Sequence, residues 1–396
     1  MIKALARNIL PIILRILTLF ISKNKNLILF GAFTGNSFGD NSGALYKYFI
    51  NKYKGQYHCV WLANYSETVA YVRSFGGEAF LKTSLKGLWF SLRTSLIITS
   101  HRAQDVLVYK PIFKRPKELY LHHGVPMRIP KFDKQNGGVM RDRSFFIDQA
   151  KSMTYMVSTS KWSAAQQGKL FSVKPSQYKI DGYPRNDIFF HPNNHEYNNY
   201  KKEYSVYEFI ILYAPTWRKW VPVRFFPFPD FDLIKMVDFL REQKMCIFLN
   251  PHPTDMRRQK DNKFWDNIQD YQDVLKMVLR NKDYSDVEIM MFMSNCLITD
   301  YSSIHYDYLL LDRPIIYLPY DKDEYVNKMG EFNCDYEEFT PGPKPRSQEE
   351  FIHYLESFKK NKDDFSKKRE RIKEIVHKYQ DGQSCQRVYK TLIEML

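Results

Sequence analysis

The chain alternates short apolar runs with longer stretches in which apolar residues recur at helical spacing. In the first half, the apolar runs predict strands at Leu27–Ala32, His58–Ala63, Leu96–Thr99, Glu118–Leu121 and Tyr155–Ser158. Between them, stretches such as 43–53 and 66–75 have the helical pattern. This β-α-β alternation predicts an open parallel sheet with helices on both faces.

A second series of the same kind follows a polar, asparagine-rich segment at 191–199 that is typical of a link between domains. Its predicted strands are Glu208–Ala214, Cys246–Asn250, Cys296–Thr299 and Pro314–Leu318. We therefore expect an α/β protein with two Rossmann-like domains whose parallel sheets face a central cleft. The expected parts are a helix at 1–26, an N-terminal domain at 27–190, a linker at 191–206, and a C-terminal domain with terminal helices at 207–396.

The first 22 residues combine apolar and basic positions. Ala4–Ile21 is strongly apolar, but Arg7, Pro11 and Arg15 interrupt it, and the uncharged stretch Ile16–Ile21 is too short to cross a bilayer. No small-residue cleavage site follows, so the pattern does not indicate a signal peptide. We expect a basic amphipathic helix that lies in the membrane interface. The alternative is a helix packed on the first domain.

The net charge of +15 favours an anionic partner, which can be nucleic acid, an anionic membrane or a phosphorylated substrate. The sequence contains no helix-turn-helix or RNP-type pattern, so we do not expect nucleic acid. The basic run near the C-terminus, from Lys359 to Lys373, is interpreted as a solvated helix face, and a membrane-facing patch is the alternative. The five cysteines have the wide spacing that is typical of buried thiols in a reducing cytosol. They are Cys59, Cys246, Cys296, Cys334 and Cys385.

The segment 299–303, Thr-Asp-Tyr-Ser-Ser, ends one of the predicted strands and precedes a helix expected to begin at Ile304. Hydroxyl groups and unpaired amides at a helix N-terminus favour an anion, because the helix dipole adds to their hydrogen bonds. The segment therefore predicts a phosphate site. Thr, Asp and Ser also cap helices without any ligand, and this alternative stays open.

Polar residues also follow other predicted strands. His122-His123-Gly124 follows one strand, Pro215-Thr216-Trp217-Arg218 follows another, and Pro251-His252-Pro253 follows a third. A histidine at a strand end is suited to act as a general base or a phosphate ligand, because its pKa lies near neutrality. An arginine in the same position suits bidentate phosphate binding. A structural role is the alternative for each residue taken alone.

At these positions the chain resembles the CDP-glycerol glycerophosphotransferase family, the teichoic-acid primases and polymerases. The segment 123–128, His-Gly-Val-Pro-Met-Arg, is similar to the family motif His-Gly-Thr-Pro-Leu-Lys. Val125, Met127 and Arg128 depart from it, and Val125 removes a hydroxyl that would be available to the acceptor. The other matching elements follow the family's order: Asp40-Asn41-Ser42 with Ala44-Leu45-Tyr46, 182–187, 214–218, 251–253, 299–303 with Asp307-Tyr308, 313–315, and Asp381-Gly382 with Arg387.

The resemblance implies a GT-B-type fold and transfer of a polyol phosphate from a CDP-activated donor, held mainly by the C-terminal domain, with release of CMP. By this resemblance His123 is the expected catalytic base and His252 the expected contact to the donor phosphates. The residues expected at the donor are Thr216, Arg218, Asp300, Ser302 and Ser303. The residues expected on the acceptor side are Gly124, Arg128, Arg185, Asp40 and Asn41.

The expected partners are CDP-glycerol, a lipid-linked glycan or polyol-phosphate acceptor, and the cytoplasmic face of an anionic membrane, in teichoic acid or capsule synthesis. CDP-ribitol is an alternative donor. No carboxylate cluster predicts a tightly held metal, but Mg²⁺ that accompanies the diphosphate stays open. Two other hypotheses also stay open: a GT-B glycosyltransferase that uses a nucleotide sugar, and a membrane-surface binding protein with a degenerate cleft.

Overall fold

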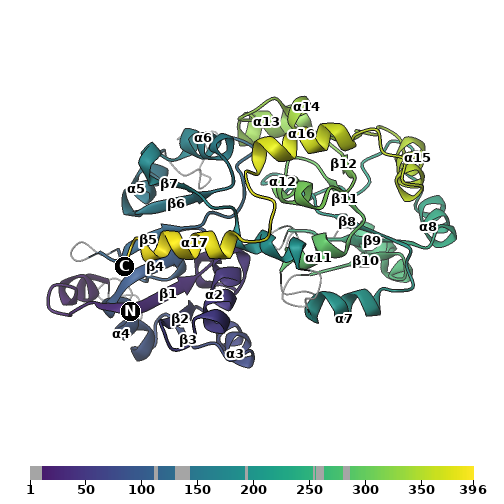
Figure 1. Cartoon of the computed structure of the whole chain (residues 1–396). Helices are drawn as coiled ribbons and strands as arrows, with labels where there is room; N and C mark the ends of the chain where they lie inside the picture. The colour runs from purple at the N-terminus through teal and green to yellow at the C-terminus, as the bar shows by residue number, and fades with distance from the viewer. Residues whose placement is uncertain are drawn as a thin grey trace. The chain divides into compact units, whose positions relative to one another are not determined.

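The computed structural model describes residues 11–110, 115–129, 143–191, 195–252, 255, 263–279 and 286–396. By its internal contacts the chain divides into two compact units. Unit 1 consists of residues 1–125, 132–187 and 381–396, and unit 2 of residues 126–131 and 188–380. Each unit contains one sheet with its own helices (Figure 1).

The sheet of unit 1 has the strand order β3-β2-β1-β4-β5-β6-β7, and neighbouring strands pair in parallel. Its strands are β1 (Asn24–Gly31), β2 (His58–Ala63), β3 (Ala79–Leu81), β4 (Thr94–Thr99), β5 (Lys117–Tyr120), β6 (Tyr155–Ser158) and β7 (Tyr178–Ile180). Its helices are α2 (Asp40–Lys52), α3 (Ser66–Ser74), α4 (Leu85–Arg93), α5 (Arg143–Ser152), α6 (Lys161–Leu170) and α17 (Ser384–Ile393). From β1 the sheet extends to β2 and β3 on one side and to β4 and the later strands on the other, so the strand order reverses between β1 and β4. Ligands of parallel sheets bind at such a point of reversal, which we call the turn-back point.

The sheet of unit 2 is also parallel, with the order β10-β9-β8-β11-β12 and a turn-back between β8 and β11. Its strands are β8 (Phe209–Tyr213), β9 (Met245–Leu249), β10 (Leu275–Met277), β11 (Cys296–Thr299) and β12 (Ile315–Tyr317). Its helices are α7 (His195–Glu203), α8 (Leu233–Glu242), α10 (Lys263–Asn267), α11 (Val287–Met293), α12 (Ile304–Tyr308), α13 (Lys322–Met329), α14 (Tyr336–Phe339), α15 (Gln348–Lys359) and α16 (Ser366–Val376). Every residue of β8, β9 and β11 is buried, as expected of strands covered on both faces.

The ends of the two units differ from the expected domain boundaries. Residues 381–396 were expected in the C-terminal domain, but they belong to unit 1. There Tyr389 of α17 stacks on Tyr53, with ring centroids 4.0 Å apart. The carboxylate of Asp187 accepts hydrogen bonds of 2.8 Å from the backbone N–H groups of Ser384 and Cys385, at the start of α17. Position 182, next to these groups, requires glycine, because the Cβ of any other residue would lie 2.5 Å from the Ser384 hydroxyl. Residues 191–206, expected as the linker, lie within unit 2 by its internal contacts and include α7.

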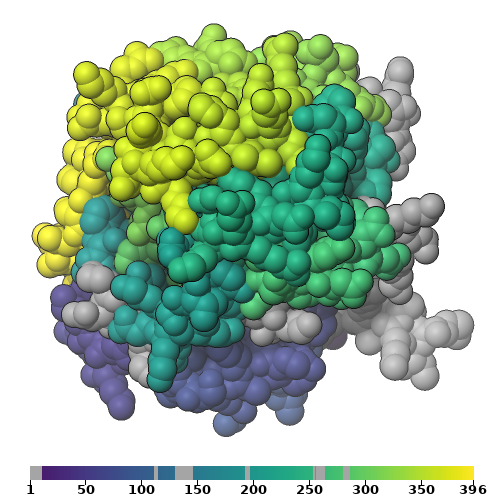
Figure 2. All heavy atoms as spheres, turned by 90° about the vertical axis from the view of Figure 1, so that its right-hand side faces the viewer, coloured from purple at the N-terminus to yellow at the C-terminus, as the bar shows by residue number. Residues whose placement is uncertain are grey.

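The basic run is exposed at half of its eight positions: Lys360, Lys362, Lys367 and Arg371 are exposed, whereas Lys359, Lys368 and Lys373 are partly buried. Figure 2 shows the yellow-green surface formed by this part of the chain. Arg369 is instead buried and pairs with Asp363 at 2.6 Å. No disulfide joins the five cysteines, four of which are buried.

The N-terminal segment packs on unit 1 and also exposes apolar side chains. Residues 1–10 of the expected helix lie outside the described residues, and residues 11–17 are helical. Leu14 is buried in the hydrophobic cluster of unit 1, whereas Ile16 and Phe20 are exposed by 53% and 77%. In the described part of the chain, no helix combines the length and hydropathy needed to cross a membrane.

The two hydrogen bonds of Asp187 give a first prediction. Replacing Asp187 by Ala leaves two amides at the start of α17 without their acceptor, and we expect a loss of about 2–3 kcal/mol in the free energy of unfolding of unit 1. Hydrogen exchange should accelerate within 381–396. Asp381→Ala is the control, because the Asp381 carboxylate is 41% exposed and its contacts with Arg387 and with the N–H of Gln383 should contribute about 0–1 kcal/mol. Equal hydrogen-exchange rates within 381–396 in the two variants would contradict the role of Asp187 in holding α17 on unit 1.

Candidate functional site

The turn-back point of the first sheet brings together the residues that follow β1, β4 and β5. Ser42, in the first turn of α2, donates its N–H to the Ser100 hydroxyl at 3.0 Å, and the two hydroxyls lie 2.8 Å apart. The buried carboxylate of Asp105 accepts hydrogen bonds of 2.7–3.2 Å from four backbone N–H groups: those of Thr34, Ser100, His101 and Arg102. One carboxylate therefore fixes the loops after β1 and β4.

Three imidazole rings stack in this place. The His123 ring lies 4.4 Å from the His101 ring at an interplanar angle of 8°, and 4.8 Å from the His122 ring at 2°. His122 is buried, and burial lowers its pKa well below the ordinary value, with His123 as the next cause. His122 is therefore neutral at physiological pH. His123 is exposed at the surface of unit 1.

Hydrogen bonds set the tautomers of the two other histidines, His123 and His101. Nδ1 of His123 lies 3.2 Å from the carbonyl oxygen of Ser100, which can only accept, so the proton of the neutral ring is on Nδ1 and the basic nitrogen is Nε2. Nδ1 of His101 accepts from the N–H of Phe33 at 3.2 Å. The His101 proton is then on Nε2, which lies 3.8 Å from the Asp40 carboxylate.

The structure brings together three of the residues expected on the acceptor side. Arg185 pairs with Asp40 at 2.9 Å, and its backbone N–H donates to the side-chain oxygen of Asn41 at 3.1 Å. The Asn41 amide in turn donates to the carbonyl oxygen of His122 at 2.9 Å. Asp40, Asn41 and Arg185 thereby connect three loops around the histidine stack, and Asp40 also approaches His101.

Backbone strain is concentrated at the same loops. In the described residues, eight non-glycine positions have a positive φ, and four of them are Phe33, Thr34, Asp40 and His122. A left-handed conformation costs roughly 1–2 kcal/mol per non-glycine residue, and such strain is typical of functional sites. Gly124 follows the histidines with φ 135°, which suits glycine alone.

Arg128, the remaining residue expected on the acceptor side, belongs to unit 2. The division between the units falls after Val125, within the 123–128 motif. Arg128 forms an antiparallel bridge with Phe332, and its guanidinium donates to the carbonyl oxygen of Met329 at 2.6 Å. The Asn333 side chain donates to the carbonyl oxygen of Pro126 at 2.6 Å. The second half of the motif is thus held by residues 329–333.

In unit 2, Arg218 lies at the turn-back point with Asp300. Its guanidinium is fully buried and pairs with Asp300 and, through two nitrogens at 2.7 and 3.0 Å, with Asp321. Tyr301 and Tyr320 lie against it, with ring centroids 5.1 and 5.0 Å away. Asp300 also accepts from the N–H of Thr216 at 2.8 Å. Direct phosphate binding by Arg218 stays a prediction, since the described guanidinium is occupied by two carboxylates.

The other residues expected at the donor lie at the carboxyl ends of adjacent strands. The Thr216 hydroxyl, after β8, is buried and has no hydrogen-bond partner among the described residues. Ser302 and Ser303 follow β11 and are partly exposed. The side chain of Ser303 makes no capping hydrogen bond, whereas the Ser302 hydroxyl accepts from the N–H of Ile304 at 3.4 Å. Capping therefore accounts for Ser302 only weakly, and does not account for Ser303.

His252 follows β9 and is exposed. Its ring centroid lies 6.1 Å from that of Trp217, which follows β8. Pro253, expected beside it, lies outside the described residues. His252, Thr216 and the serines thus lie after three neighbouring strands of one parallel sheet, where a ligand of such a sheet binds.

A family comparison decides what kind of protein has these sites. The family model for CDP-glycerol:poly(glycerophosphate) glycerophosphotransferase matches residues 13–394. The chain belongs to this family. The expected resemblance is therefore confirmed, and the protein is an enzyme of the teichoic acid polyol-phosphate transferase type.

Individual relatives agree with the family. The chain is 28% identical to a teichoic acid glycerol-phosphate transferase of Staphylococcus aureus, over 94% of each chain. It is 25% identical to a teichoic acid poly(glycerol phosphate) polymerase of Bacillus spizizenii, over 91% of each chain. The solved structure of the wall teichoic acid polymerase TagF is similar with a TM-score of 0.76, at 21% identity, over 100% of this chain and 98% of that chain. This likeness confirms the expected GT-B-type fold.

Three residues of these sites were missed by the sequence analysis. His101 lies just after β4, and a search of the residues beyond the end of that predicted strand would have found it. Asp105 lies outside any motif and becomes visible only through its four backbone contacts. Asp321 lies more than 100 residues from Arg218 in the sequence, so no local pattern could pair them.

The ion pairs of Arg218 give a prediction for the transferase. Arg218→Lys keeps the charge but loses the planar fork that binds Asp321 through two nitrogens, so we expect a loss on the order of 3 kcal/mol in the free energy of unfolding of unit 2. Urea unfolding measures it. Arg241→Lys is the matched control, because Arg241 makes the same two-nitrogen contact with Asp273 at an exposed position and should cost less than about 1 kcal/mol. Similar losses of unfolding free energy in the two variants would show that burial does not determine how much the ion pair contributes to stability.

Proposed function

We propose that the enzyme transfers glycerol phosphate from CDP-glycerol to a hydroxyl of a lipid-linked or growing glycan or polyol-phosphate acceptor, and releases CMP. The product is a teichoic acid or a related polymer of the cell envelope, such as a capsule. The observation that carries the proposal is the hydrogen bond between Nδ1 of His123 and the Ser100 carbonyl, because it makes Nε2 the basic nitrogen of an exposed ring.

In this mechanism His123 is the general base. The acceptor oxygen attacks the β-phosphorus of CDP-glycerol while its proton passes to Nε2 of His123. The bond between the β-phosphorus and the bridging oxygen breaks, and CMP leaves with that oxygen. The new phosphodiester joins glycerol phosphate to the acceptor. His101 is a positioning residue, since it stacks on the His123 ring and is itself oriented by Phe33 and Asp40.

The donor is held by unit 2. His252, Thr216, Ser302 and Ser303 contact its phosphates and stabilise the charge that grows on them and on CMP. The unsatisfied Thr216 hydroxyl supports this assignment. Arg218 and Asp300 act by fixing the loops after β8 and β11, which places Thr216 and the two serines. In the described residues no group of three or more His, Cys, Asp or Glu side chains forms a metal site, and Mg²⁺ brought by the diphosphate stays a prediction.

Glycerol is proposed as the donor polyol because two relatives matched over more than nine-tenths of their length are glycerol-phosphate enzymes, at 28% and 25% identity. A teichoic acid poly(ribitol-phosphate) polymerase of Bacillus spizizenii is also similar, at 24% identity. CDP-ribitol is therefore the second candidate donor.

The enzyme acts as a peripheral protein at the cytoplasmic face of the membrane in this proposal. The exposed side chains of Ile12, Ile16 and Phe20 provide an apolar surface, and the exposed Lys25 follows them to meet anionic headgroups.

The catalytic proposal predicts that His123→Ala lowers kcat for CMP release by about 10²–10⁴-fold, because the general base is lost. The affinity for CDP-glycerol should stay within about twofold, since unit 2 holds the donor. The measurement is CMP release with CDP-glycerol, CDP-ribitol and nucleotide sugars, each offered with a lipid-linked disaccharide acceptor. His58→Ala is the control, because this half-buried histidine of β2 pairs with surface Glu78 and lies against Phe90, and it belongs to none of the sites described above. Release from no CDP-polyol by the wild-type enzyme would refute the proposed function.

The membrane proposal predicts that the double variant Ile16→Glu/Phe20→Glu floats less with anionic phosphatidylglycerol vesicles, by about tenfold or more in partitioning, because two exposed apolar side chains are lost and two anions are gained. Val206→Glu is the control, since Val206 is an exposed apolar residue of unit 2. Unchanged flotation of the double variant would contradict the proposed contact between the N-terminal segment and the membrane.

A further inference from the structure

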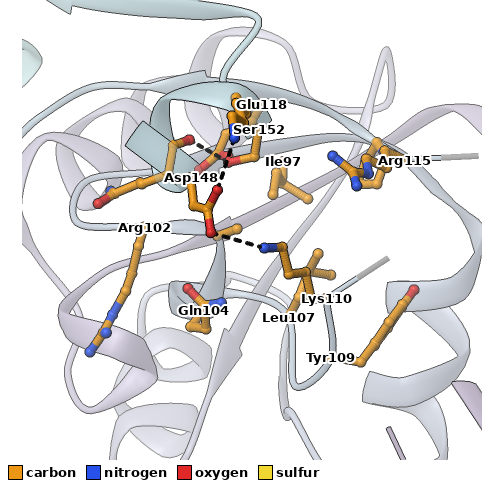
Figure 3. A pocket seen from close by; sticks show the side chains of 14 residues that line it. Ile97, Arg102, Gln104, Leu107, Tyr109, Lys110, Arg115, Glu118, Asp148 and Ser152 are labelled. Carbon is orange, nitrogen blue, oxygen red and sulfur yellow. Dashed lines mark hydrogen bonds and ion pairs between the residues drawn. The ribbon is translucent and has the colours of Figure 1, made fainter. Parts of the chain in front are cut away.

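A cavity of about 480 Å³ lies in unit 1, close to the histidine stack. It is formed by β4, the segment after β4, the start of β5 and α5 (Figure 3). Its volume is within the range of sites for small ligands. None of the residues assigned above to catalysis or donor binding lines it.

Two contacts connect the cavity to the histidine stack. Gln149 lines the cavity and donates its side-chain N–H to the carbonyl oxygen of His101. Arg102, the residue after His101 in the chain, also lines the cavity. Its guanidinium donates to the Thr34 hydroxyl at 3.0 Å and turns away from the other cations (Figure 3). The cavity therefore borders the loops that position His123.

The charge of the cavity is positive. Lys110, Arg115 and Lys151 line it, and Figure 3 shows the Lys110 ammonium reaching Asp148 at 3.8 Å. Lys151 lies 3.2 Å from the same carboxylate, so one carboxylate faces two ammonium groups. The two lysines hold the pKa of Asp148 below its ordinary value, so it is ionised. Arg115 makes no ion pair with the described residues.

Glu118 also lines the cavity, and hydrogen bonds occupy its carboxyl group. The hydroxyls of Ser152 and Thr99 donate to it at 2.7 and 2.8 Å. Burial raises the pKa of Glu118, whereas these two hydrogen bonds lower it. Besides Arg102, the lining residues therefore include three cationic side chains and two carboxyl groups, one of which is buried and already hydrogen-bonded.

The floor of the cavity is apolar. Ile97, Leu107 and Tyr109 line it, and all three belong to the hydrophobic cluster of unit 1. Leu14 of the N-terminal segment packs in the same cluster, and Ile21 packs against it. The cavity therefore combines a basic rim with an apolar floor, and the segment that exposes Ile16 and Phe20 packs on the same cluster. Such a combination fits an amphiphilic anion.

We propose that this cavity binds the phosphate or diphosphate group of the lipid-linked acceptor, with Lys110, Arg115 and Lys151 as its cationic contacts. The inference rests on the proposed function, which it extends by assigning a site and a chemical class to the acceptor. The anion replaces Asp148 as the partner of the lysines, and the apolar floor receives the adjoining lipid carbons. The acceptor is thereby anchored beside the loops that carry His101 and His123.

The kinetic test uses the full-length double variant Arg115→Gln/Lys151→Gln. Its KM for a short-chain alkyl diphosphate-linked disaccharide should rise about 10–100-fold, because charge-assisted hydrogen bonds are lost, and its KM for CDP-glycerol should stay within about twofold. With the same disaccharide on a neutral alkyl chain, wild type and variant should have the same KM. Lys161→Gln/Lys169→Gln, which removes two exposed lysines of α6, is the charge-matched control. An unchanged KM for the diphosphate acceptor, or an equal rise with the neutral acceptor, overturns the proposal.

A binding measurement tests the cavity independently of turnover. Isothermal titration of the wild-type enzyme with pyrophosphate, in saturating CDP to occupy the donor site, should show one site that the double variant weakens by tenfold or more. Equal affinity of pyrophosphate for the wild-type enzyme and the double variant, or no binding to either, refutes the proposed anion site in the cavity. If the cavity binds pyrophosphate but no CDP-polyol yields CMP, the proposed function fails while the anion site stands.

Discussion

The carboxylate of Asp105 organises the site of unit 1, because four backbone N–H groups from two loops converge on it. Burial raises its pKa to about 7, although the four hydrogen bonds act in the opposite direction by favouring the ionised form. Each hydrogen bond to an ionised group is worth about 1.5–3 kcal/mol, which is comparable to the cost of holding Phe33 and Thr34 at positive φ. Its partners include the amides of Ser100 and His101, so the tautomer of His123 and the position of the stacked ring both depend on this carboxylate.

Unit 2 uses the same principle with the opposite charge. Arg218 is a buried cation between two carboxylates, and through Asp300 it fixes the amide of Thr216. A buried charge is tolerated only when it is paired and hydrogen-bonded, so the position of each group is determined by the others. In both units a buried, hydrogen-bonded ionisable group therefore holds the loops at the turn-back point of a parallel sheet, while the groups suited to substrate, His123 and His252, stay exposed.

The fold followed from the sequence because its signals are local. Buried strands such as β8 and β9 are continuous apolar runs, and the strand ends could be located by where those runs stop. The sequence could not show which polar residues meet. The pairing of Arg218 with Asp321 joins residues that are remote in the chain, and the attachment of α17 to unit 1 depends on Asp187, almost 200 residues earlier. Pairings of this kind are set by tertiary structure, which periodicity does not encode.

The 123–128 motif spans the division between the two units, and each half is held by residues of its own unit. His123 and Gly124 belong to unit 1, where the positive φ of glycine lets the chain leave the histidine stack, and residues 126–128 belong to unit 2, where they bond to Asn333, Phe332 and Met329. The hydrogen bond from the Asn333 side chain to Pro126 fixes the chain three residues beyond His123. Residues 330–333 follow α13, which begins next to Asp321, the partner of Arg218. Residues 126–128 and the buried guanidinium of Arg218 are therefore held by adjoining parts of the same segment of unit 2, because α13 connects them.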